Sequence, residues 1–175
     1  MEAPAADSVD AWKSLFGDEY GSTAATSTTD ALTLSATTRE IASGEQDLTR
    51  DHNILLGIDG RHTVRVVARS SATRSGRGRP RPLSARGNLV PIGRTLHFSI
   101  EECTVQPPYA VYWKVRNDGP EAIRRGMLRG EIAERGERIA ETSDFSGSHW
   151  VQAWIVKAGV AVATGVQDVT IMPRV

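Results

Sequence analysis

Two stretches of the chain, residues 95–101 and 109–117, alternate apolar and polar side chains, and this pattern restricts the fold more than any other feature. The apolar sets are Leu96, Phe98 and Ile100 in the first stretch, and Tyr109, Val111, Trp113 and Val115 in the second. Successive side chains of a β-strand point to opposite faces, so each stretch predicts a strand with one buried face. In the second stretch, Tyr112, Lys114 and Arg116 form the other face, which we expect to meet solvent or a ligand.

The rest of the folded part consists of short strand-like runs separated by turn residues. Runs 54–58 and 62–67 flank Asp59-Gly60, a pairing that predicts a hairpin. Further strands are predicted at 128–132, 138–143, 148–156, 160–163 and 166–171, and one helical turn is predicted at Pro120. About eight strands with almost no helix predict an all-β fold, an antiparallel β-sandwich of the immunoglobulin-like or a similar type. Its expected core comprises Phe98, Val111, Trp113, Val115, Leu128 and Ile132.

The first 50 residues differ in composition from the rest. They carry nine acidic and three basic side chains and are rich in Ala, Ser and Thr. Val9, Trp12, Leu15 and Phe16 fall near helical spacing, which predicts a short helix near residues 8–17. We therefore expect residues 1–50 to form an acidic, mostly disordered arm and residues 51–175 to form the sandwich.

A flexible, arginine-rich loop is predicted at residues 70–88. Nine arginines and no acidic residue occur between Arg61 and Arg94. The segment Arg74–Arg86 is either a solvated loop or a contact for nucleic acid or nucleotide phosphates, and it contains no aromatic side chain on which bases could stack.

Catalytic motifs are absent from the sequence. It has no glycine-rich phosphate loop, no nucleophile elbow and no pair of carboxylates typical of a two-metal site, and its four histidines lack ligand spacing. Cys103 is the only cysteine, the N-terminus lacks secretory features, and no apolar run is long enough for a bilayer. We expect a cytoplasmic protein that is not an enzyme, with no cofactor, no metal and no membrane partner. A hydrolase with a non-standard site is a weaker alternative.

Polar groups at strand ends or beside glycines are the candidates for ligand binding. They are Arg116, Asn117, Arg129, Thr142 and His149. If they converge, they offer guanidinium, amide and imidazole groups to an anionic or peptide-like ligand. Alternatively, they satisfy one another and the turns.

An ordered series of short motifs resembles a known family. The series comprises Tyr112–Gly119 with Ala122, Leu128–Ile132, Glu141-Thr142 with Phe145–Gln152, Ile155–Lys157 and Val162-Ala163. It resembles the C-terminal sensor domain of bacterial adenylyl/guanylyl cyclases and of nucleotidyltransferases that make second-messenger oligonucleotides in anti-phage systems. The resemblance covers about residues 95–171, with a weaker likeness at Trp12–Tyr20 to the tail that follows the catalytic domain. Gln152 and Ala153 depart from the family pattern.

The resemblance implies a non-catalytic sensor that responds to a phage-derived or nucleotide ligand. Its implied partner is a nucleotide cyclase or an oligonucleotide nucleotidyltransferase, in the same chain or a separate one, in bacterial anti-phage defence. The arginine-rich loop keeps a second hypothesis open, a general nucleic-acid or polyanion-binding module.

Overall fold

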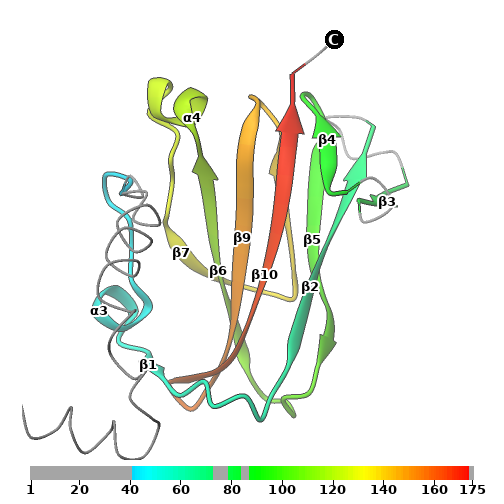
Figure 1. Ribbon diagram of the computed structural model, residues 1–175. Helices are drawn as coiled ribbons and strands as arrows, with labels where there is room; N and C mark the ends of the chain where they lie inside the picture. The colour runs from blue at the N-terminus through cyan, green and yellow to red at the C-terminus, as the bar shows by residue number, and fades with distance from the viewer. Residues whose placement is uncertain (1–40, 73–78, 84–86, 174–175) are drawn as a thin grey trace, which may run out of the picture. The chain divides into compact units, whose positions relative to one another are not determined.

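Two β-sheets packed face to face form the folded part of the chain (Figure 1). The computed structural model describes residues 41–72, 79–83 and 87–173. The predicted helix near residues 8–17 and most of Arg74–Arg86 lie outside these ranges. The predicted all-β sandwich is confirmed, and the described residues form ten strands in place of about eight.

The first sheet has six strands, and β10 (Val160–Met172) pairs with three of the others. β10 pairs antiparallel with β9 (Gly147–Lys157), which pairs with β6 (Ala110–Asp118), and β7 (Ile132–Arg135) follows at the edge. Two short strands, β1 (Leu55–Leu56) and β4 (Leu89–Pro91), pair parallel with β10.

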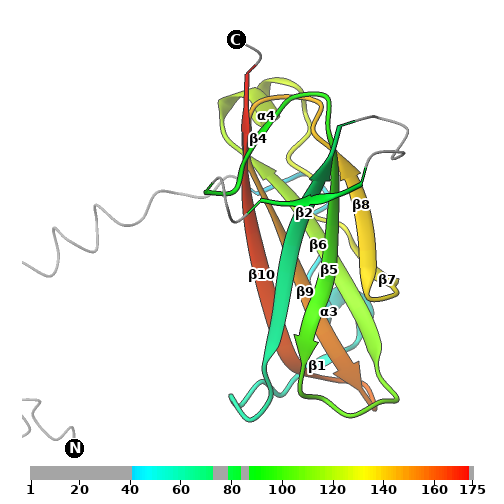
Figure 2. The ribbon, with the colours of Figure 1, turned by 90° about the vertical axis from the view of Figure 1, so that its right-hand side faces the viewer.

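The second sheet has four strands in the order β3-β2-β5-β8. Their bounds are β3 Arg81–Pro82, β2 Val64–Ser71, β5 Thr95–Cys103 and β8 Arg138–Thr142. Figure 2 views the molecule from the side of this sheet, with β2 and β5 in front of β6 and β9. The short helix α4 (Pro120–Arg124) lies at one end of the sandwich, beyond β6, in both views.

The main core fills the space between the two sheets. Trp113 is 2% exposed there, and its Nε1–H donates to the carbonyl oxygen of Gly136 at 2.8 Å. Phe98, Val111 and Val115 are also buried in this core. Of the other expected core residues, Ile132 is buried in a second cluster, whereas Leu128 is only half-buried.

The second cluster covers the outer face of the six-stranded sheet. The helix α3 (Leu48–His52) packs there through Leu48, with Asp47 as its N-cap accepting hydrogen bonds from Thr49 N and Arg50 N. Ile54 and Trp154 belong to the same cluster. In Figure 1, α3 lies on the side of this sheet away from β2 and β5. The sandwich was expected to start at residue 51, but the packed structure also includes residues before it. Leu48 belongs to this part and helps to bury the outer face of β9 and β10.

The hairpin predicted around Asp59-Gly60 is wrong. β1 pairs with β10 in one sheet and β2 pairs with β5 in the other, so the turn connects the two sheets instead of two neighbouring strands. Gly57 follows β1 where a Cβ would lie 2.6 Å from Val160 Cγ1, which lets the segment run close along β10.

Two other predicted elements differ from the structure. Residues 160–163 and 166–171 belong to one strand, β10. Its pairing with β9 shifts register between Ala161 and Ala163. The strand predicted at 128–132 begins only at Ile132, because Arg129 (φ 61°) and Gly130 (φ 143°) leave the extended conformation. Within the described ranges, no helix is long and apolar enough to cross a bilayer.

The loop predicted at 70–88 is partly ordered where the structure describes it. Arg81 and Pro82 form β3 against β2, and Leu83, 3% exposed, packs into the main core.

Candidate sensor site

Three of the five predicted site residues, Asn117, Arg129 and His149, lie close together at the end of the sandwich that carries α4. Asn117 on β6 and His149 on β9 are paired in register. The ring nitrogen His149 Nδ1 lies 2.5 Å from Asn117 Oδ1, and Asn117 Nδ2 donates to the carbonyl oxygen of Met127 at 2.7 Å. These contacts attach the segment after α4 to the two central strands.

His149 is a neutral imidazole held in the core. It is 2% exposed, and its ring stacks on Phe98 with centroids 5.9 Å apart. Burial, followed by the positive charge of Arg129, lowers the pKa of His149 to about 4. Because an amide oxygen accepts, Nδ1 carries the proton, and Nε2 is an acceptor with no partner among the described residues.

Arg129 reaches the same region from the irregular segment before β7. Its Nη1 donates to Glu141 Oε2 at 2.5 Å, and its Nε lies 3.8 Å from Glu131 Oε2. Glu141 lies on β8 of the opposite sheet, and its side chain is only 12% exposed. This ion pair therefore joins the two sheets across the end of the sandwich.

Glu141 is a site residue that the sequence prediction missed. The prediction chose its neighbour Thr142, which is exposed and donates to Asp144 Oδ2 at 2.5 Å. In β8 the buried Ile139 and the partly buried Glu141 share one face. The period-two rule, applied to 138–142, would have placed Glu141 inside and Thr142 outside.

A cavity of about 330 Å³ lies between β7 and β8 beside these groups. Its walls include the apolar side chains of Trp113, Val115 and Ile139. Its charged lining consists of Arg129, Glu131, Arg135 and Glu141. Small-molecule sites typically combine an apolar body with a few fixed polar groups, and this volume lies at the lower end of their range.

Arg116 is not part of this cavity, because the alternation of β6 turns it to the outer face. Its guanidinium binds the carboxylate of Glu45 and lies 2.9 Å from Asp118 Oδ1. The Nζ of Lys114 lies 2.8 Å from Glu45 Oε1 and donates to the carbonyl oxygen of Gln46 at 2.9 Å. The expected solvent or ligand face of β6 is therefore covered by residues 45–48. We call residues 42–46, which cross this face, the strap.

Glu45 is ionised within this cluster. Burial alone would raise the pKa of Glu45, but the hydrogen bond from Lys114 and the charges of Lys114 and Arg116 together lower it below its usual value. The strap is thus held on the sheet by one carboxylate shared between two cations.

Comparison with known families identifies the domain. The family model for the Adenylyl/Guanylyl and SMODS C-terminal sensor domain matches residues 46–172. The chain belongs to this family. The match includes α3 and every strand of both sheets, a longer stretch than the resemblance at 95–171 covered. No curated protein and no solved structure matches the chain.

The family is one of sensor domains and not of catalytic domains. Family membership also associates this sensor domain with adenylyl/guanylyl cyclases and SMODS nucleotidyltransferases. Among the residues that the structure describes, no three His, Cys, Asp or Glu side chains are grouped closely enough to hold a metal ion.

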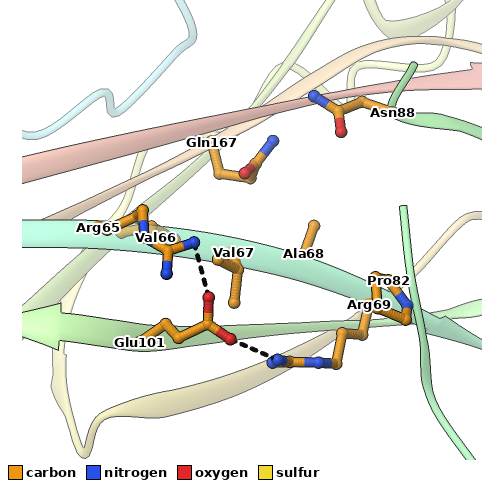
Figure 3. Close-up of a pocket in the computed structure, with 9 residues that line it drawn as sticks. All are labelled: Arg65, Val66, Val67, Ala68, Arg69, Pro82, Asn88, Glu101 and Gln167. Atoms are coloured by element: carbon orange, nitrogen blue, oxygen red, sulfur yellow. Dashed lines mark hydrogen bonds and ion pairs between the residues drawn. The ribbon is translucent and has the colours of Figure 1, made fainter. Parts of the chain in front are cut away.

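A second hollow of the sensor domain, about 390 Å³, lies between β2 and β10 (Figure 3). Arg65 and Arg69 both reach Glu101 there, at 2.7 Å each, and Arg65 also pairs with Glu102. Its arginines are thus neutralised by carboxylates of the same sheet, and this hollow is a weaker candidate for an anionic ligand than its arginine content implies.

Proposed function

We propose that this sensor domain binds a small phage-derived or nucleotide ligand in the cavity between β7 and β8 and transmits the binding to a nucleotide-synthesising enzyme. The enzyme is a cyclase or an oligonucleotide nucleotidyltransferase, joined to the domain or separate from it. The setting is bacterial anti-phage defence in the cytoplasm. The ligand-contacting residues are Arg129 and Glu141, and Asn117 and His149 position the segment that carries Arg129.

The observation that carries this proposal is that adjacent residues contact the cavity and the strap. Arg129 lines the cavity, while the carbonyl oxygen of Gly130 accepts a hydrogen bond from Gln46 N at 3.1 Å. A Cβ added to Gly130 would lie 2.7 Å from Glu45 Cγ, so the strap runs directly over this glycine. A ligand that displaces Arg129 from Glu141 therefore moves the surface on which the strap rests.

The direction of the coupling follows from chain order. The strap immediately precedes α3, and in this proposal a change in its position is passed to the part of the chain before it. The family model describes a C-terminal sensor domain, and the domain that it would regulate therefore precedes it in this proposal. Coupling of this kind requires that the ligand bind two states of the segment with different affinity.

The test is an infection assay in cells that carry the chain together with its nucleotide-synthesising enzyme. Arg129→Gln removes the cavity guanidinium, and Thr142→Ala changes an exposed residue outside the cavity. We expect the Arg129 variant to remain folded and to lose most of the phage response, while the Thr142 variant responds as wild type does. A full response by a folded Arg129 variant would show that the sensing site is elsewhere.

A second candidate function is binding of nucleic acid or another polyanion through the arginine-rich loop. It is supported by the nine arginines without an acidic residue between Arg61 and Arg94. Of the segment Arg74–Arg86, the structure describes Arg79 and Arg81, and both are exposed. Binding dominated by phosphate contacts weakens by about one log unit per log unit of salt for each contacted phosphate, whereas binding in the β7–β8 cavity depends much less on salt.

A further inference from the structure

A third hollow, about 760 Å³, opens beside β3 and β4 and is lined by three arginines from different parts of the chain. Arg79 precedes β3, Arg81 lies in it, and Arg94 follows β4. Among the described residues that line the hollow, none is acidic. We propose that this hollow is a second binding site, which takes the phosphate groups of a mononucleotide or dinucleotide. It does not depend on the function proposed for the β7–β8 cavity.

The three arginines differ from most arginines of the folded part in having no carboxylate partner. Arg65 and Arg69 bind Glu101, Arg124 and Arg125 bind Glu121, and other arginines are paired in the same way. Within the described ranges, Arg79, Arg81 and Arg94 form no ion pair. Three guanidinium groups facing one hollow repel one another unless an anion lies between them, and phosphate oxygens fit the guanidinium fork.

The backbone that carries two of these arginines is fixed. Ser143, which is fully buried, accepts a hydrogen bond at Oγ from Arg94 N at 2.8 Å, and its own N–H donates to Arg94 O at 3.0 Å. Arg81 is paired with Ser70 in the ladder between β3 and β2. Because their backbone is held by the sandwich, ligand binding orders only the side chains of these two arginines and not the backbone that carries them.

The floor of the hollow is apolar. Leu83 and Val90 are 3% and 1% exposed, and Pro91 lies beside them. An apolar floor within a cationic rim suits a base or ribose with phosphates attached. A long single strand usually needs aromatic side chains on which its bases stack, and no aromatic residue lines this hollow. These features favour a small nucleotide over a polynucleotide.

The experiment is a calorimetric titration of the full chain with ATP. A second titration uses single-stranded DNA of about 20 nucleotides. The test variant replaces Arg79, Arg81 and Arg94 with Gln. The matched control replaces Arg61, Arg124 and Arg138 with Gln, which removes the same charge from exposed positions outside the hollow. We expect ATP to bind wild type and the control within about twofold of each other, and the test variant to bind roughly tenfold or more weakly.

Each other outcome has a defined meaning. Equal losses in both triple variants would overturn the proposal, because they would indicate general electrostatic attraction. Tighter binding of DNA than of ATP, with a steep salt dependence, would also overturn it and would indicate a polyanion surface. If the triple variant melts early, Arg79→Gln and Arg94→Gln alone replace it, each with an expected loss of several-fold. Thr142→Ala, at an exposed residue that lines neither hollow, should leave ATP binding unchanged.

Discussion

The carboxylate of Glu45 lies against the guanidinium of Arg116, whose side chain is fully buried on the outer face of β6. Lys114 binds the same carboxylate, so one acidic side chain of the strap compensates two cations of the sheet. A buried charge is stable only with a partner, and this cluster therefore makes the strap and the sandwich depend on each other.

Removal of the Glu45 charge should destabilise the domain strongly. Glu45→Gln leaves Arg116 and Lys114 with less compensation, and we expect the free energy of unfolding to fall by about 3–5 kcal/mol, as for a broken buried ion pair. Urea unfolding followed by circular dichroism measures it. The control is Glu121→Gln, which removes the exposed pairs with Arg124 and Arg125 and should cost less than about 1 kcal/mol.

Glu45 also gives this cluster a pH dependence. Because its folded-state pKa lies below the ordinary value of 4.5, its stabilising contribution is complete above about pH 4.5 and is lost as the pH falls through the folded-state pKa. Glu45→Gln should flatten the stability profile in this acidic range. An unchanged profile would show that Glu45 is not the titrating group.

His149 should give a second pH dependence at higher pH. Its folded-state pKa of about 4 lies below the ordinary value of 6.5, so between these values the unfolded chain binds a proton that the folded chain does not. Stability should therefore fall by about 3 kcal/mol as the pH drops from 6.5 to 4.

The measurement for His149 is urea unfolding at several pH values. His149→Gln should lose the slope between pH 6.5 and 4, even if its stability at neutral pH is lower. The exposed His62, changed to Gln, is the matched control and should keep the wild-type slope. A slope retained in His149→Gln would assign the effect to another group.

A methyl group at Gly130 should disturb the strap. In Gly130→Ala the added Cβ meets Glu45 at 2.7 Å, and φ of 143° is unfavourable for any side chain. We expect a loss of about 1–3 kcal/mol and faster hydrogen exchange at Gln46 N, whose acceptor is the carbonyl of Gly130. Gly136→Ala, which adds its methyl group in open space, should change stability by less than about 0.5 kcal/mol. Unchanged exchange at Gln46 N in Gly130→Ala would contradict the close approach of the strap.

The core prediction concerns Trp113. Trp113→Ala should lower the free energy of unfolding by about 3–5 kcal/mol, the usual range for a buried aromatic side chain. Trp113→Phe keeps most of the packing but loses the hydrogen bond to Gly136, so it should cost less. Met127→Ala, at a residue 51% exposed, should have little effect. Similar stabilities of Trp113→Ala and wild type would contradict a central role for this side chain.

The sequence alone determined the fold class and the inward faces of β5 and β6. Alternation at 95–101 and 109–117 placed Phe98 and Trp113 in the core, and both are buried there. The motifs around Tyr112–Gly119 and Gly147–Gln152 also led to the family that the comparison confirmed. These signals are local, because a strand's period and a motif's spacing are written in neighbouring residues.

Only the tertiary structure decided what covers each face and which strand edges pair. Period two put Arg116 on the face of β6 opposite Trp113, but nothing near it in sequence indicated that Glu45 would cover that face. Nor did the local sequence indicate that Met127 and His149 would bind Asn117. The Asp59-Gly60 turn failed as a hairpin for the same reason, since β1 finds its partner in β10, over 100 residues away in the chain. A local pattern fixes the direction of a side chain, whereas its partner depends on which distant segment best buries the exposed surface and compensates the charge.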